Sequence, residues 1–149
     1  MKTSTDQQYA KIVFLLQQDE DGYPPAGSES VWATIKDETY IIDNIPFFAR
    51  GVSFGDVVTA EKVDGELIYK TTVEYSGHST FRFLFSKREL LQKVRQELNE
   101  MGCSSEKSHL EDLISVDVPP EVSMLKFREF LSKYVQENVI GFEEAAIFD

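Results

Sequence analysis

Cysteine, histidine and glycine are scarce in this chain of 149 residues, and their scarcity excludes several kinds of site. The single cysteine, Cys103, rules out an internal disulfide. The two histidines, His78 and His109, show no metal-ligand spacing with Cys103, so we expect no bound metal. The eight glycines form no loop that would cradle a phosphate, and we expect no cofactor.

Long apolar runs are also missing. No stretch approaches the ~20 apolar residues that a membrane-spanning helix needs. Residues 1–10 are polar and contain no apolar signal core. We therefore expect a cytoplasmic protein that does not enter a membrane.

Acidic side chains are in clear excess. The chain has 26 Asp and Glu against 15 Lys and Arg, which gives a formal net charge of −11 at pH 7. A negative surface repels phosphate backbones and anionic membranes, so we expect no nucleic-acid partner. It attracts a basic protein and raises the rate of association with it. The alternative is that the charge only keeps the protein soluble.

The first half has the pattern of a small antiparallel β-sheet or barrel. Alternating apolar residues predict strands at residues 9–16, 31–35, 39–43, 56–63 and 66–75. Asp37–Glu38 and Asp64–Gly65 are predicted turns of two hairpins, and residues 17–30 are a predicted loop. Residues 44–54 contain Pro46 and three phenylalanines. We expect them to form a packed loop whose Phe47, Phe48 and Phe54 are largely buried and plug one end of the barrel.

The second half alternates between strands and helices. Strands are predicted at residues 80–85, 113–118 and 142–148, with a short extra strand at residues 103–105. One helix is expected to start at Ser86, with Ser86 and Glu89 as a capping box, and to stop at Gly102. A second helix is expected to start at Pro119–Pro120.

This order is βαββαβ, which is typical of the ferredoxin-like fold. The predicted fold class is thus α+β, with the N-terminal all-β part packed on a C-terminal ferredoxin-like half. The predicted boundaries are a disordered N-terminus at residues 1–8, an all-β sub-domain at 9–77 and a ferredoxin-like sub-domain at 78–149.

One stretch of the chain carries a family signature. Residues 44–58 read NIPFFARGVSFGDVV, and this stretch resembles the signature of a bacterial family of domains of unknown function. Relatives are also similar around residues 21–33, 76–80 and the C-terminal half. The resemblance implies no assigned activity. The family commonly ends in an acidic pair followed by Ala-Cys, whereas this chain has Ala145-Ala146, which excludes a role for a cysteine there.

Five residues form a candidate pocket between the halves: Arg50, Asp56, His78, Glu143 and Glu144. Arg50 suits a carboxylate or another anion, and His78 exchanges protons near neutral pH. Each residue also has a structural alternative. Arg50 and Asp56 can pair to hold their loop, and His78 can bond to backbone at the junction. Of the two consecutive glutamates on a strand, one can be buried against Arg50 or His78 while the other is solvated. We assign no catalytic residue.

The candidate interface lies in the acidic loop and comprises Asp19, Glu20, Asp21, Tyr23 and Glu29, because charge beside an aromatic is typical of interface anchors. The first functional hypothesis is a non-enzymatic binding protein, specifically a bacterial immunity or antitoxin-type inhibitor of a basic toxin domain. The second is an enzyme or small-ligand binder that uses the pocket. The third is a regulatory or structural module of an operon-encoded assembly. The oligomeric state stays open.

Overall fold

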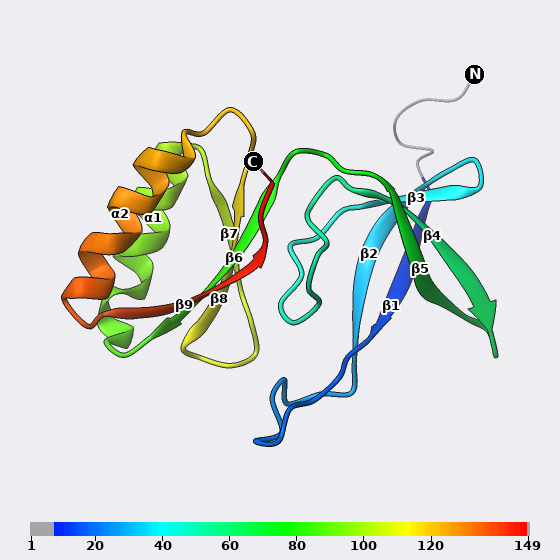
Figure 1. The fold of residues 1–149 in the computed structure, drawn as a ribbon, viewed down its shortest axis with the longest axis horizontal. Coiled ribbons are helices and arrows are strands. Elements are labelled where there is room, and N and C mark those ends of the chain that lie inside the picture. Colours follow the sequence, from blue (N-terminus) through cyan, green and yellow to red (C-terminus); the bar gives the residue numbers. More distant parts are fainter. Residues whose placement is uncertain (1–7, 149) are drawn as a thin grey trace. The chain divides into compact units, whose positions relative to one another are not determined.

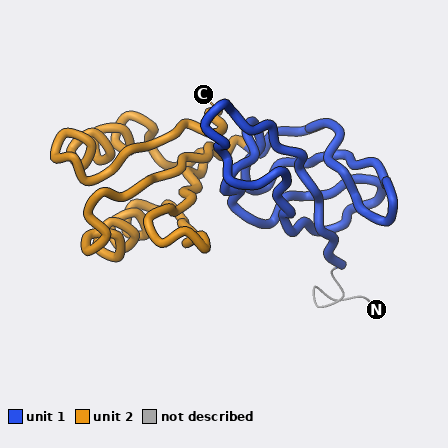
Figure 2. The backbone as a smooth tube through the Cα atoms, turned by 90° about the horizontal axis from the view of Figure 1, so that it is seen from below, with its two compact units in different colours: residues 1–76 blue, residues 77–149 orange. Residues whose placement is uncertain are grey.

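The computed structural model describes residues 8–148, which form two compact units that meet in sequence between Ser76 and Gly77 (Figure 2). Each unit has a hydrophobic core of its own. Together the units contain two sheets and two α-helices, so the predicted α+β class is confirmed. The disorder expected at residues 1–8 falls, apart from Gln8, outside the described residues.

The first unit is a closed five-stranded barrel in which each strand pairs with the next one along the chain (Figure 1). The strands are β1 (Tyr9–Leu15), β2 (Ser28–Lys36), β3 (Thr39–Ile42), β4 (Val57–Val63) and β5 (Glu66–Glu74). Consecutive strands are antiparallel, as expected. Because direction alternates along the series, the first and fifth strands run the same way. The pair that closes the barrel is therefore parallel, with Ile12 opposite Leu67 and Val13 opposite Ile68.

The two predicted hairpin turns are confirmed. Asp37 and Asp64 take positive φ angles of 57° and 52°, a region that aspartate tolerates better than most residues. Gly65 follows with φ 85°, so both central residues of the β4–β5 turn have the positive φ that a tight hairpin requires. The β2 strand begins at Ser28, three residues earlier than predicted, because its first residues pair with the end of β1.

The core of the barrel combines alternate strand residues with part of the loop between β3 and β4. Its buried members are Ile12, Phe14, Val31, Ala33, Ile42, Ala49, Val52 and Val58. The loop thus reaches the core as expected, although its most deeply buried side chains are not those of the phenylalanines. Phe47, Phe48 and Phe54 are half-buried, whereas Ala49 and Val52 are almost inaccessible. Hydrogen bonds from the backbone of residues 47–49 to Glu29 hold the loop in place, and in this position the smaller side chains of Ala49 and Val52 enter the barrel core.

The second unit is a four-stranded antiparallel sheet with both helices on one face (Figure 1). The strands follow the order β7-β8-β6-β9 across the sheet. Along the chain the elements are β6 (Ser79–Phe85), the short 3₁₀ helix η2 (Arg88–Leu90), α1 (Leu91–Met101), β7 (Ser104–Lys107), β8 (Leu113–Val118), α2 (Met124–Gln136) and β9 (Ile140–Ala146). The short extra strand predicted near residue 104 is confirmed as β7.

Apolar alternation on β6 builds the core of this unit. Phe81, Phe83 and Phe85 are buried, and Phe127 of α2 packs between the first two with ring centroids 4.7 and 6.2 Å away. Val94 and Leu98 of α1 complete the contact between helices and sheet. Gly102 ends α1 with φ 95°, as the sequence predicts.

Two predicted helix starts are wrong. Ser86 and Glu89 do not form a capping box, because the Ser86 N–H already donates to the Val139 carbonyl at 2.8 Å and the helix opens with a 3₁₀ turn. The second helix begins at Met124 and not at the prolines. Its N-cap is Ser123, whose Oγ accepts from the Lys126 N–H at 3.2 Å. Within residues 8–148, neither helix has the length and apolar character needed to cross a membrane.

Phe127 offers a direct test of the second core. Phe127→Ala should lower the free energy of unfolding of this unit by about 3–5 kcal/mol, because the fully buried ring leaves a cavity between two other rings. Leu125→Ala is the matched control on the same helix, since Leu125 is 71% exposed, and should change it by less than about 0.5 kcal/mol. Urea unfolding followed by circular dichroism measures both. Equal effects of the two substitutions would contradict the described packing.

Candidate functional site

The acidic loop between β1 and β2 is held by its own hydrogen bonds. The Asp19 carboxylate accepts from the Asp21 and Tyr23 N–H groups, both at 2.9 Å, and the Asp19 N–H donates to the Tyr23 carbonyl at 2.8 Å. The Gln18 side chain donates to the Gly22 and Pro24 carbonyls. The Asp19 carboxylate therefore stabilises the conformation of the loop and also contributes to its negative charge.

The exposed side chains of this loop include Glu20, Asp21 and Tyr23. Glu20 and Asp21 are exposed, and the Tyr23 side chain is 41% exposed while its ring meets Phe48 edge-on at 6.1 Å. Two carboxylates and a phenol thus lie within four residues of a structured loop. Such an arrangement suits contact with a basic surface.

Glu29 behaves differently from the other candidate interface residues. It lies on β2, is half-buried, and its carboxylate accepts from three consecutive backbone N–H groups: Phe47 at 2.6 Å, Phe48 at 3.0 Å and Ala49 at 2.8 Å. The carboxylate is thus committed to the loop between β3 and β4. These contacts indicate that Glu29 has a structural role in holding the β3–β4 loop.

Asp56 anchors the other end of the same loop. The buried carboxylate accepts from the Ser53 and Ser76 N–H groups, both at 2.9 Å, and from the Ser76 hydroxyl at 3.0 Å. Arg50 lies exposed in the loop that Asp56 holds. Both residues belong to the first unit, whereas His78, Glu143 and Glu144 belong to the second, so the pocket proposed between the halves stays a prediction.

His78 pairs with the carboxylate of Asp117, a partner that the sequence did not indicate. The Nδ1 atom of His78 lies 2.8 and 3.0 Å from the two carboxylate oxygens of Asp117, at the end of β8. The backbone contact expected for His78 stays a prediction beside this bond. Burial raises the pKa of the Asp117 carboxyl, the hydrogen bond from His78 lowers it, and the charge of Glu121 raises it again, with a net upward shift. The residues are 39 positions apart, so spacing carried no signal of the pair.

Two side chains of a kind that can act as nucleophiles, Ser79 and Cys103, belong to the same unit as this pair. The Ser79 hydroxyl accepts from the Phe148 N–H at 2.9 Å, which ties down the end of the chain. The Cys103 thiol is 2% exposed, and burial together with the Asp117 charge raises its pKa to about 12. Neither side chain has the environment of an activated nucleophile.

Glu143 and Glu144 face opposite sides of β9, as expected, and each pairs with an arginine of its own unit. Glu143 Oε1 lies 3.2 Å from Nε of Arg82, which is buried in the middle of β6, and Glu144 accepts from Arg128 of α2 at 2.6 Å. A contact of the buried glutamate with Arg50 or His78 stays a prediction, and the pairing with Arg82 was not expected. An arginine between Phe81 and Phe83 was the available signal, because its side chain must leave the phenylalanine face.

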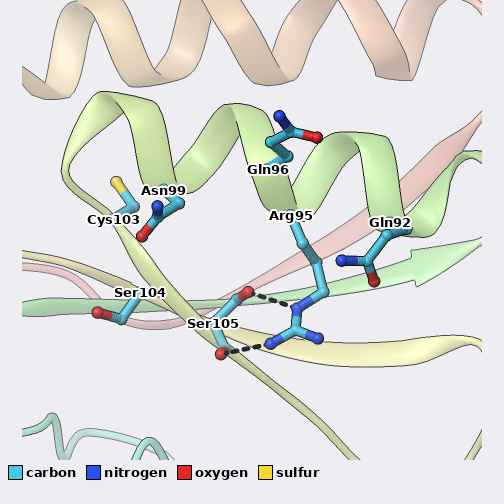
Figure 3. Close-up of a pocket in the computed structure, with 7 residues that line it drawn as sticks. All are labelled: Gln92, Arg95, Gln96, Asn99, Cys103, Ser104 and Ser105. Carbon is cyan, nitrogen blue, oxygen red and sulfur yellow. Dashed lines mark hydrogen bonds between the residues drawn. The ribbon is translucent and has the colours of Figure 1, made fainter.

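A polar groove of about 440 Å³ lies beside α1 and β7 (Figure 3). Its lining consists of Gln92, Arg95, Gln96, Asn99, Cys103, Ser104 and Ser105. Figure 3 shows the Arg95 guanidinium directed at Ser105, where it donates to the hydroxyl at 2.9 Å and to the carbonyl at 3.0 Å. Because β7 is an edge strand, this contact protects part of an otherwise open edge.

The comparisons with known proteins add a family and a fold. A family model described as a domain of unknown function, DUF4265, matches residues 29–142. The chain belongs to the DUF4265 family. A hypothetical protein from Neisseria gonorrhoeae has a similar crystal structure, with a TM-score of 0.79 and 21% sequence identity over 95% of this chain and 97% of that one. At this identity the likeness shows the fold alone. No curated protein matches the chain.

The DUF4265 match confirms the resemblance to a family of unknown function. Some of the candidate residues lie inside the matched region and others lie before it. Glu29 opens the matched region, which also contains Asp56, His78 and Asp117. The outward acidic loop at residues 19–23 precedes it. Over residues 8–148, no group of three or more His, Cys, Asp or Glu side chains is placed to hold a metal ion.

The role of Glu29 can be measured directly. Glu29→Ala should cost roughly 2–4 kcal/mol of stability in the first unit, because three N–H groups lose a charged acceptor. Hydrogen exchange at residues 47–49 should accelerate along with the loss. Glu20→Ala, which removes an exposed carboxylate, is the control and should stay within about 0.5 kcal/mol of the native protein. Unchanged exchange at residues 47–49 would contradict the anchoring role.

Cys103 should be inert in the folded protein. With a pKa of about 12, only about 10⁻⁴ of the thiol is ionised at pH 8, roughly a thousandfold less than for a thiol with the ordinary pKa of 9.0. Alkylation by iodoacetamide at pH 8 should therefore be slow in buffer and fast in urea. Because the folded pKa is raised, the stabilisation linked to the protonated thiol is complete below about pH 9 and is lost as pH rises toward 12. Rapid alkylation of the folded protein would show that the thiol is accessible and ionisable.

Proposed function

We propose that this DUF4265 protein is a non-catalytic binding protein that takes a basic protein partner through the acidic loop of its first unit. The observation that carries the proposal is the preorganised loop, in which the Asp19 carboxylate holds the backbone while Glu20 and Asp21 remain exposed beside Tyr23. A loop that is already ordered loses little conformational entropy on binding. The net charge of −11 adds long-range attraction for a basic partner.

The specific form of the proposal is an immunity or antitoxin-type inhibitor in the cytoplasm. Toxins that act on nucleic acids need basic grooves, and an acidic protein can block such a groove after steered association. A toxin gene beside the gene for this chain would favour this form over a regulatory module of an operon-encoded assembly.

We also infer a ferredoxin-like arrangement for the second unit. Support comes from its strand-helix-strand-strand-helix-strand order and from the position of β6 and β8 in the centre of the sheet. This arrangement is a scaffold for many functions and favours no single one.

A catalytic or small-ligand function is the second candidate, and the contact of His78 with Asp117 favours it. A carboxylate on Nδ1 fixes the orientation and tautomer of an imidazole, as general bases require. Against this candidate stand the protonated Cys103 thiol and the Ser79 hydroxyl bonded to Phe148. We therefore rank it second.

The main test asks whether electrostatic attraction by the acidic loop raises the rate of association with the partner. The tagged protein is used to isolate its partner, and the association rate is then measured by stopped flow over a range of salt. Glu20→Lys/Asp21→Lys should lower the rate about threefold to tenfold at low salt, and the difference should shrink near 0.15 M salt, where the screening length is about 8 Å. Asp19 is left unchanged because its carboxylate holds the loop.

The control is Glu61→Lys/Glu66→Lys, which makes the same change in net charge on exposed residues of the β4–β5 hairpin. This variant should retain most of the association rate. Equal losses for the two double variants would show that only total charge matters. A rate indifferent to salt and to the loop substitutions would refute the steering mechanism.

A further inference from the structure

A second feature of the first unit lies on the outer surface of the barrel. A shallow pocket of about 330 Å³ is lined by Tyr9 of β1, Trp32 of β2, and Asp43 and Asn44, which follow β3. The strand β2 pairs with β1 on one side and β3 on the other. Trp32 is thus at the centre, with Tyr9 on one side and the Asp43 carboxylate on the other.

The backbone holds this pocket in a defined geometry. The Trp32 N–H donates to the Asn44 side-chain oxygen at 2.7 Å, and the Trp32 carbonyl accepts from the Asp43 N–H at 2.8 Å. Val31 and Ala33 point into the core, so alternation along β2 directs the indole outward. The Trp32 and Tyr9 side chains are 46% and 54% exposed. Two large aromatic residues that remain exposed around one pocket are typical of a recognition site.

The charges around the pocket indicate which ligand fits. The Lys11 ammonium lies 5.1 Å from the centre of the Trp32 ring, so the ring already holds a cation of the chain itself. Asp43 is exposed, and no ion pair within residues 8–148 includes it. An aromatic face with a nearby carboxylate attracts cations and disfavours anions. The unit that carries the pocket has 13 acidic and 6 basic residues up to Ser76, which adds to this preference.

We propose that this pocket receives a lysine or arginine side chain of the protein partner. The cationic group lies over Trp32 in place of the Lys11 ammonium, the aliphatic stem packs against Tyr9, and Asp43 is the counter-ion. The inference rests on the proposed function and deepens it, because it specifies one anchor residue of the basic partner.

The pocket and the acidic loop belong to the same hairpin. Residues 16–27 connect β1 to β2. Tyr9 and Lys11 are exposed near the start of β1 and Leu15 is 71% exposed at its end, whereas Val13 between them is buried. The β1–β2 hairpin therefore carries Tyr9 and Trp32 of the pocket on its strands and the acidic loop at its turn. One partner surface can meet both features, with the loop providing attraction and the pocket providing an anchor.

Trp32 is the sole tryptophan of the chain, so its fluorescence reports on the pocket without a label. The probes are three capped tripeptides with Lys, Arg or the neutral norleucine between two glycines. The Lys and Arg peptides should change the Trp32 emission in a saturable way, and the norleucine peptide should not. Asp43→Asn should weaken binding of the charged peptides about threefold to tenfold, because the counter-ion is lost while the backbone bonds of residue 43 remain.

Two further variants sharpen the test. Lys11→Gln removes the resident cation and should tighten binding of the Lys and Arg peptides about twofold to fivefold. Asp37→Asn, which neutralises an exposed acid in the β2–β3 turn, is the matched control for Asp43→Asn and should leave binding unchanged. Circular dichroism verifies that each variant is folded.

Three outcomes would overturn the inference: no saturable response to either charged peptide, an equal response to the norleucine peptide, or equal losses for Asp43→Asn and Asp37→Asn. These outcomes are independent of the acidic loop. If the charged peptides bind while Glu20→Lys/Asp21→Lys leaves partner association unchanged, the steering proposal fails and the pocket stands. If the peptides do not bind, the pocket fails whatever the loop does.

Discussion

The Glu29 carboxylate accepts hydrogen bonds from three consecutive backbone amides, and the packing of the first unit depends on this contact. The loop between β3 and β4 contains Pro46 and leaves the regular ladder, so strand pairing cannot satisfy its N–H groups. An ionised carboxylate has enough lone pairs to accept all three. With the backbone at residues 47–49 held, Ala49 and Val52 can enter the barrel core. Asp56 holds the far end of the loop in the same way.

Several carboxylates hold backbone, so they contribute to the net charge of −11 but are not the acids that a partner would contact directly. Glu29 and Asp56 are half-buried or buried and bonded to N–H groups, and Asp19 divides its role between loop geometry and surface charge. Glu20 and Asp21 are the exposed acids of the loop. A charge count from the sequence treats all five alike, whereas the structure separates the acids that build the scaffold from those that face outward.

Local patterns in the sequence predicted most of the strands, because alternation and turn residues act over a few positions. The Asp64–Gly65 turn and the Gly102 helix stop are examples, each set by the backbone preference of the residue itself. Contacts between distant residues were missed. Asp117 lies 39 positions from His78. The failed capping box has the same origin, since the Val139 carbonyl that binds the Ser86 N–H lies 53 positions away.

The distinction between residues that hold the backbone and residues that are exposed also helps to compare a binding function with a catalytic one. In the second unit His78 is oriented by Asp117, yet Cys103 is protonated and Ser79 is engaged by the chain end, so an imidazole alone would have to do the chemistry. In the first unit the exposed acidic loop, Tyr9 and Trp32 belong to the β1–β2 hairpin. The family match begins at Glu29, after the acidic loop and within that hairpin. The matched region leaves out both this loop and β1, whose Ile12 and Phe14 belong to the barrel core, so the barrel extends beyond the matched residues.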